Sequence, residues 1–297
     1  MSLFTFGCSF TQYAWPTWAD IAGQEFEFYE NWGQAGGGNQ FIFNSLMECL
    51  VKNKISKDDT VVIMWTNIFR EDKYVDNKWL TPGNLFHQDT YDKKFVKKFA
   101  DIRGYFIRDI NIVFATQNIL KNIGCKFYFL SMVPLTNSDQ YYYENINDKI
   151  EDLLEHFQPV LEQVRPSVYE VIFNFDWTSR AFAANNKITG RGIHYNRIRD
   201  SMWPEWDDQD EAKFITNLSD KIKKECYDNF QLDLYHNDKP LFKRVDYHPT
   251  PLEHLEYLEK VLPEITISQS TKEWTVSMDA DVKMDKCKWH LKTPMRW

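Results

Sequence analysis

The chain has few of the residues that mark fibrous or membrane-spanning proteins. Its 297 residues include only eleven glycines and eleven prolines, too few for a collagen-like or low-complexity protein. No stretch approaches the eighteen consecutive apolar residues that suggest a membrane-spanning helix. The first ten residues lack the basic and apolar regions of a signal peptide. We therefore expect a cytoplasmic protein that has no membrane partner.

Cysteine and positive charge are also scarce. The five cysteines are scattered, and no CxxC pair or Cys/His spacing matches a zinc site, so we expect reduced thiols and no metal. The net charge is −8 and no run of five Lys or Arg occurs, which argues against a nucleic-acid partner. Aromatic residues are plentiful instead, at 16% with eleven tryptophans. Such residues fill cores and also stack against sugars and bases.

Strands alternate with helices along the first part of the chain. Continuous apolar runs indicate buried strands, and apolar residues at a spacing of three to four indicate helices. The predicted elements are strands 3–6, 25–29, 60–65 and 126–133, and helices 16–21, 40–51 and 103–123. This alternation predicts an α/β fold in which helices cover both faces of a mostly parallel sheet.

The pattern is less regular after residue 135. Helices are expected at 149–164 and 210–226, and a well-marked helix begins at Thr250-Pro251-Leu252-Glu253, which combines an N-cap, a first-turn proline and a capping box. We interpret residues 136–243 as an insertion or cap that is rich in tryptophan. The core is then formed by residues 1–135 and 244–265. The extension 266–297 alternates weakly and is expected to form a hairpin or to wrap the domain.

Candidate site residues follow the predicted strands, because ligands in such sheets bind at the carboxyl ends of the strands. Ser9 comes just after the first strand, where a rigid element would hold it. Gly36 lies in a glycine-rich loop, where a backbone N–H can approach a ligand closely. The amide of Asn67, after the third strand, can donate to an oxyanion. His248 directly precedes the capped helix and follows Asp246 by two residues.

These blocks resemble the SGNH hydrolases, or GDSL-type esterases, a family named for a Ser, a Gly, an Asn and a His in separate blocks. Gly7-Cys8-Ser9 stands where the family usually has Gly-Asp-Ser, and residues 31–36 keep its Asn-x-x-x-x-Gly spacing. Thr66-Asn67-Ile68 keeps only the Asn of Gly-x-Asn-Asp. Asp246-Tyr247-His248-Pro249 is one residue shorter than the usual Asp-x-x-His-Pro. The segment WPTWAD and the sequence around His248 look most like virus-encoded (phage) members, which would act in the host cytoplasm.

The resemblance implies a flavodoxin-like three-layer α/β/α sandwich and a serine hydrolase that needs no cofactor. In it His248 takes the proton of Ser9, and Asp246 orients the imidazole. The N–H groups of Ser9 and Gly36 and the amide of Asn67 form the oxyanion hole. The implied substrate is an ester or O-acetyl group on a small molecule or a glycan. An O-acyltransferase using the same site, or an inactive binding or virion protein with this fold, are the alternatives.

Several alternatives stay open at the level of single residues. Ser9 can be an ordinary turn residue, and Gly37 or Gly38 can replace Gly36 as the donor. Asn67 can be a cap, with Thr66 as the donor instead. Asp233 and His236 also fit an Asp-x-x-His spacing. If Asp246 does not reach His248, a backbone carbonyl orients the histidine and the site is a Ser–His dyad.

Charged residues near these blocks also have two interpretations. Arg70, with its neighbours Glu71 and Asp72, either lines the cleft and binds substrate or belongs to a solvated charge cluster. The four lysines between residues 93 and 98 are expected to form a solvated helix face. We expect His254, six residues after His248, at the surface.

Overall fold

The computed structural model describes residues 1–53, 55–85, 91–136, 147–173, 235–236, 239–240, 248–283, 287 and 289. The chain divides into two compact units. The first comprises Met1–Ile172, Pro249–Met278 and Lys288–Trp297, and the second comprises Phe173–His248 and Asp279–Cys287. The helix expected at 210–226 lies outside the described residues.

A four-stranded parallel sheet forms the centre of the first unit. Its strand order is β2-β1-β3-β6, and every neighbouring pair runs parallel. The strands are β1 (Ser2–Phe6), β2 (Phe28–Asn31), β3 (Thr60–Trp65) and β6 (Lys126–Ser131). All six residues of β3 are buried, as the continuous apolar run TVVIMW predicts for a strand covered on both faces. The expected α/β class with a mostly parallel sheet is confirmed.

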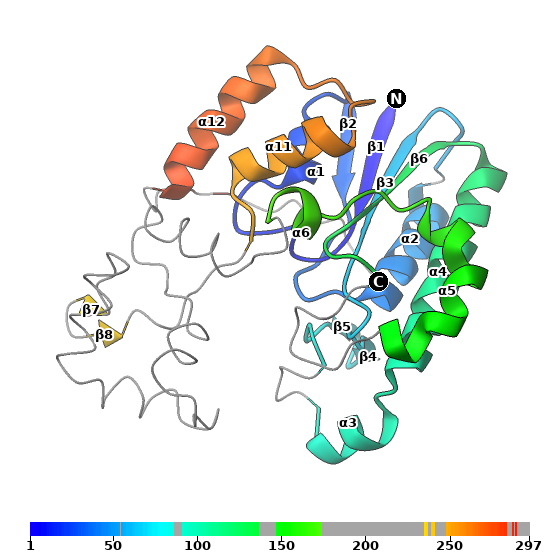
Figure 1. Ribbon diagram of the computed structural model, residues 1–297. Helices are drawn as coiled ribbons and strands as arrows, with labels where there is room; N and C mark the ends of the chain where they lie inside the picture. The colour runs from blue at the N-terminus through cyan, green and yellow to red at the C-terminus, as the bar shows by residue number, and fades with distance from the viewer. Residues whose placement is uncertain are drawn as a thin grey trace. The chain divides into compact units, whose positions relative to one another are not determined.

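Helices lie on both sides of this sheet (Figure 1). On one side are α2 (Asn39–Asn53), α4 (Ile102–Ile123) and α5 (Asn147–Leu161). On the other side are α1 (Trp18–Gly23), α6 (Val168–Val171) and α11 (Pro251–Val261). The capping box predicted at Thr250 is present, with the Thr250 backbone N–H donating to Glu253 at 3.0 Å. In the described part of the chain, no helix is long and apolar enough to cross a membrane.

Two early elements begin later than the sequence pattern predicts. Helix α1 starts at Trp18 rather than at residue 16, because Asp20 accepts the backbone N–H of Thr17 at 2.9 Å and fixes Thr17 as the N-cap. Strand β2 starts at Phe28 rather than at residue 25. The N–H of Glu25 is used in the turn that ends α1, where it donates to the Ala22 carbonyl.

Of the two alternatives for the C-terminal extension, the hairpin is wrong over Gln269–Lys283, because these residues form helix α12. Its buried stripe includes Thr271, Thr275 and Asp279, which recur every four residues. These side chains are polar, so a search for apolar periodicity does not find the helix. Ser268 caps it by accepting the backbone N–H of Thr271 at 3.3 Å.

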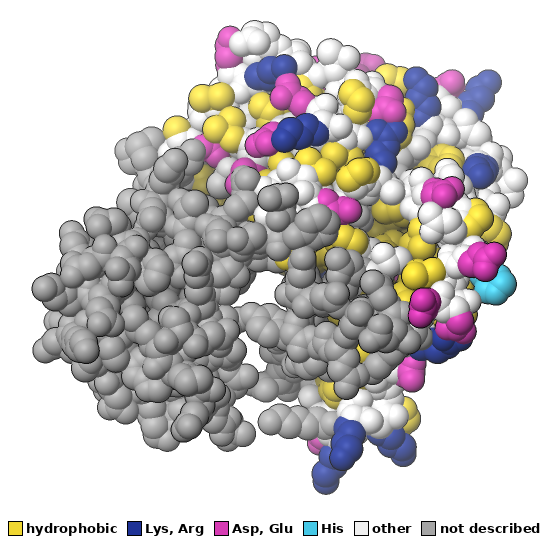
Figure 2. Space-filling view, viewed as in Figure 1, with side chains coloured by type: hydrophobic (Ala, Val, Ile, Leu, Met, Phe, Trp, Pro, Cys, Tyr) yellow, Lys and Arg dark blue, Asp and Glu magenta, His cyan; other side chains and the backbone are white. Residues whose placement is uncertain are grey.

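The remaining described elements are short. The hairpin of β4 (Lys73–Val75) and β5 (Lys78–Leu80) follows the β3 loop, and α3 (Lys93–Phe99) precedes α4. Strands β7 (Tyr235–His236) and β8 (Lys239–Pro240) pair antiparallel in the second unit. On α3, the side chains of Lys94, Lys97 and Lys98 are exposed, as expected. Figure 2 shows acidic and basic side chains interspersed over the described part of the visible face.

Asp20 makes stability depend on pH. Burial raises the pKa of its carboxyl to about 6, despite hydrogen bonds from Thr17 and Tyr29. Above the unfolded pKa near 4, the unfolded state ionises more readily than the folded state, so this group lowers the free energy of unfolding as pH rises. Between pH 4 and pH 7 the wild type should lose about 3 kcal/mol of unfolding free energy through Asp20. We expect the Asp20→Asn variant not to show this loss.

Urea unfolding of the wild type and of Asp20→Asn at several pH values measures this loss. The difference between their unfolding free energies should change with pH mainly between pH 4 and pH 6. A difference that stays constant over this range would contradict an elevated pKa at Asp20.

Candidate active site

The strand order places two candidate residues at a topological switch point. Strand β1 lies between β2 and β3 in the sheet. The connection after β1 leads to β2 on one side of β1, and the connection after β3 leads to β6 on the other side, so the loops that follow these two neighbouring strands point away from each other. Crevices at such points are the usual ligand sites of open parallel sheets. Ser9 lies in the loop after β1, and Asn67 lies in the loop after β3.

A short, firmly held turn carries Ser9. The backbone N–H groups of Thr11 and Gln12 donate to the Cys8 carbonyl at 2.9 and 3.1 Å, which forms one helical turn around Ser9. The Thr11 carbonyl accepts the Asn31 amide at 2.7 Å and the Thr17 hydroxyl at 2.6 Å. The end of β2 and the start of α1 therefore fix the turn from two directions.

The functional groups of Ser9 are left unused by the fold. Its side chain makes no hydrogen bond to any residue that the structure describes, and neither does its backbone N–H. The residue is 8% exposed. A serine kept only for its turn would ordinarily bond its hydroxyl to nearby backbone. Here the geometry of the turn depends on Thr11, Asn31 and Thr17 instead.

Asn67 is oriented through one end of its amide only. Its side-chain oxygen accepts the backbone N–H of Phe69 at 2.6 Å, which is an Asx turn. The amide nitrogen has no hydrogen-bond partner within the described residues. The side chain is 5% exposed. Asn67 is thus a cap, as one interpretation of the sequence predicts. Its amide nitrogen could still donate a hydrogen bond to a ligand.

Among the three adjacent glycines, the hydrogen bonds distinguish Gly36. The Gly37 N–H donates to the Gln34 carbonyl at 3.0 Å, and the Gly38 N–H donates to the Asp72 carboxylate at 2.9 Å. The N–H of Gly36 has no partner among the residues described. Gly36 has a φ of 76°, and a Cβ there would lie 2.1 Å from the Thr81 carbonyl, so only glycine fits.

Met132 and Arg70 bring these loops together. The sulfur of Met132, after β6, lies 3.7 Å from Cys8 Sγ and 3.8 Å from Thr66 Oγ1. The Arg70 guanidinium lies 3.7 Å from the same sulfur and donates to the Gly37 carbonyl at 2.8 Å. Three of these contacts involve a residue next to one of the predicted donors: Cys8 precedes Ser9, Thr66 precedes Asn67, and Gly37 follows Gly36. The loops after all four strands therefore converge on one small region.

Of the two interpretations of residues 70–72, the solvated charge cluster is wrong. Arg70 is half-buried, while Glu71 and Asp72 are buried. Asp72 accepts the backbone N–H groups of Gly38 and Phe41, both at 2.9 Å, and so caps the start of α2. Burial raises the pKa of its carboxyl, although these hydrogen bonds oppose the rise.

A second buried network, which sequence reasoning missed, holds the loop after β3. Asn39 donates its amide to Asp109 at 2.7 Å and to the Thr66 carbonyl at 3.0 Å, and it accepts the Thr66 N–H at 2.9 Å. Asp109 also accepts Arg108 Nε at 2.6 Å. Burial raises the pKa of the Asp109 carboxyl to about 6 against the attraction of Arg108. The partners lie 27 and 70 residues from Asn39, so no local signal could reveal them.

The residue that follows the predicted base His248 accepts a hydrogen bond from Trp15. His248 is half-buried. The next residue, Pro249, accepts the indole N–H of Trp15 through its carbonyl at 2.9 Å, and Trp15 follows the Ser9 turn by a few residues. Asp246, Asp233 and the side chain of His236 lie outside the described residues.

The expected surface position of His254 is wrong. Its side chain is 0% exposed, because it follows Pro251 by three residues and precedes Leu258 by four, which places it in the buried stripe of α11.

Comparison of the chain with protein-family models, with curated proteins and with solved structures found no match. Within the described residues, no group of three or more His, Cys, Asp or Glu side chains is placed to hold a metal ion. Within the described residues, Cys8 and Cys125 are buried and form no disulfide.

Proposed function

We propose that the protein is a serine hydrolase that cleaves an ester or O-acetyl group, with Ser9 as nucleophile and His248 as base. One observation carries the proposal: the Ser9 hydroxyl and all three predicted oxyanion donors are hydrogen-bond groups that the described fold leaves unused. These donors are the N–H groups of Ser9 and Gly36 and the amide nitrogen of Asn67. Ser9 and Asn67 are buried and Gly36 is partly buried. Buried polar groups ordinarily have partners, and a bound oxyanion would supply one.

In the proposed reaction, His248 removes the proton of Ser9 as the hydroxyl oxygen attacks the acyl carbon. The negative charge that develops on the carbonyl oxygen is held by the donors from the three loops. The alcohol leaves with the proton from His248. His248 then takes a proton from a water molecule as the water oxygen attacks the acyl carbon, and it returns the proton to the Ser9 oxygen as the acid is released. Asp246, or a backbone carbonyl in its place, would orient the imidazole.

Two further features support the proposal. Within the described residues, the parallel strand order β2-β1-β3-β6 matches the first four strands of the flavodoxin-like order 2-1-3-4-5. The resemblance to the SGNH hydrolases implies that fold. The hydrogen bond from Trp15 to Pro249 ties the residue after His248 to the segment that follows Ser9. We therefore propose the SGNH-like fold together with the activity.

Labelling with a fluorophosphonate, which reacts with activated serines, tests the proposal. We expect one adduct on the wild-type protein, located at Ser9 by peptide mass, and no adduct on Ser9→Ala or His248→Ala. Circular dichroism and thermal unfolding establish that each variant is folded. Folded wild-type protein that forms no adduct, or forms it at another serine, would contradict the proposal and favour a binding role.

A further inference from the structure

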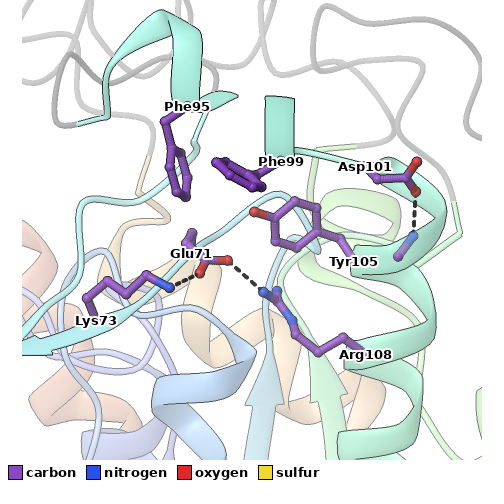
Figure 3. Close-up of a pocket in the computed structure, with 8 residues that line it drawn as sticks. Glu71, Lys73, Phe95, Phe99, Asp101, Tyr105 and Arg108 are labelled. Carbon is purple, nitrogen blue, oxygen red and sulfur yellow. Dashed lines mark hydrogen bonds and ion pairs between the residues drawn. The ribbon is translucent and has the colours of Figure 1, made fainter. Parts of the chain in front are cut away.

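A cavity of about 380 Å³ lies beside the candidate active site and has no role in the proposed acyl chemistry. It lies between α3 and the start of α4, with the segment that joins the β3 loop to β4 as its floor (Figure 3). Its volume is at the lower end of the range for small-molecule sites, roughly 300–1,000 Å³, so it suits a ligand of about one ring. Arg108 connects the two places, since it donates to the Arg70 carbonyl at 2.9 Å.

The floor of the cavity consists of charged side chains that pair with one another. Glu71 forms ion pairs with Lys73 and with Arg108, the latter at 3.0 Å. Burial opposes ionisation of Glu71, but its hydrogen bonds to Lys73 and Tyr105 and the nearby cations hold the pKa of its carboxyl below the ordinary value. The lining residues Glu71, Lys73, Asp101 and Arg108 carry two charges of each sign. A neutral ligand therefore fits this floor better than an ion.

The wall opposite is aromatic. Phe95 and Phe99 project over the floor, and their ring centres lie 5.1 Å apart with a tilt of 46°. Tyr91 stacks on Phe95 at 5.3 Å. Because these rings contact one another, a flat ring cannot insert between them. Phe99 is 57% exposed, and besides Phe95 its ring contacts the ammonium of Lys98, whose nitrogen lies 5.0 Å from the ring centre.

From these features we infer that the cavity binds the pyranose ring of a neutral sugar. One face of a sugar ring carries C–H groups that pack on a single aromatic face, and its edge carries hydroxyls that both donate and accept. Phe95 and Phe99 offer the aromatic face, while the Glu71 carboxylate and the Lys73 ammonium offer an acceptor and a donor side by side. The inference does not require a reactive Ser9.

Saturation-transfer difference NMR tests the inference on the full-length Ser9→Ala variant, which cannot process a substrate by the proposed route. The probes are the methyl glycosides of glucose, galactose, mannose and xylose, with adenosine and benzoate as a flat base and a flat anion. We expect transfer to the ring protons of at least one glycoside, and little to adenosine or benzoate. Titration of that glycoside then gives its dissociation constant.

The Phe99→Ala substitution locates the binding. The side chain is largely exposed, so we expect a folded variant whose dissociation constant for the glycoside rises by about five- to tenfold, the loss of one aromatic packing partner. Phe114→Ala is the matched control, because Phe114 is 51% exposed on α4 and does not line the cavity. It should leave the dissociation constant unchanged.

Three results would overturn the inference: no transfer to any glycoside, equal transfer in Phe99→Ala, or stronger binding of adenosine or benzoate than of every glycoside. Because the protein tested carries Ser9→Ala, an absence of glycoside binding does not affect the conclusion from fluorophosphonate labelling of the wild type. The converse also holds, since sugar binding by a protein that forms no adduct would support the cavity and reject the hydrolase.

Discussion

Replacing Ser9 with alanine is expected to reduce ester hydrolysis by about 10⁴-fold or more, while the free energy of unfolding changes by less than about 0.5 kcal/mol. The two halves of this expectation have different origins. Activity falls because the nucleophile is lost, leaving only binding and the oxyanion donors to promote attack by water. Stability is kept because the hydroxyl makes no hydrogen bond within the described chain, so its removal leaves no described group without a partner.

Ser131→Ala is the matched control for this prediction. Ser131 is also a buried serine at the carboxyl end of a strand of the same sheet, but its hydroxyl donates to the Arg165 carbonyl at 3.4 Å. We expect full activity and a destabilisation of about 0.5–1.5 kcal/mol. Hydrolysis of p-nitrophenyl acetate and urea unfolding measure both quantities. If Ser9→Ala costs stability and not activity, Ser9 is a structural turn residue.

The sequence contains enough information to predict the sheet and the positions of the site loops. Buried parallel strands are continuous apolar runs, and β1 and β3 were found within one residue of their observed ends. Once these strands are known, the rule that ligands bind at their carboxyl ends selects the loops that hold Ser9 and Asn67. The choice of Gly36 over its neighbours needed the structure, because it depends on which N–H groups are already bonded.

The contacts that join the loops could not be predicted in this way. Met132 was seen only as an apolar residue at the end of a strand, whereas its sulfur contacts the loops after β1 and β3. Asn39 directly follows the glycines of the loop after β2 and begins α2. Its three partners come from positions 66 and 109, and a pairing over such separations leaves no trace in local periodicity.

The β4–β5 hairpin, by contrast, was missed although the sequence carries its signal. Asp76 and Asn77 have φ values of 50° and 60°, so both residues of the two-residue turn adopt the left-handed conformation. Such turns favour Asn and Asp, which tolerate this conformation better than other non-glycine residues. The pair lies between the strands KYV and KWL. Each strand consists of a lysine, an aromatic residue and an aliphatic residue in that order.

The largest effect on stability is expected at Asn39, where alanine should lower the free energy of unfolding by about 3–5 kcal/mol. The substitution removes three hydrogen bonds at a fully buried position. The N–H and carbonyl of Thr66 and one oxygen of Asp109 would each lose a partner, at about 1–3 kcal/mol for an unsatisfied buried group, with relaxation recovering part of the total. Asn44→Ala, on the same helix, is the control. Within the described residues, its amide bonds only to the Gln40 carbonyl four residues earlier, so we expect a cost below about 1 kcal/mol.

Asn39→Asp separates the loss of hydrogen bonds from a change in charge. It keeps the shape of the side chain but places a second carboxylate 2.7 Å from Asp109, where the wild type has a donor. The pKa of Asp109 is already raised to about 6, and a like charge raises it further. The folded state then holds a proton that the unfolded state releases above about pH 4, so stability falls as pH rises. Urea unfolding should show Asn39→Asp approaching the wild type near pH 5 and falling well below it at pH 8. A deficit that does not change with pH would mean that the two side chains do not share a hydrogen bond.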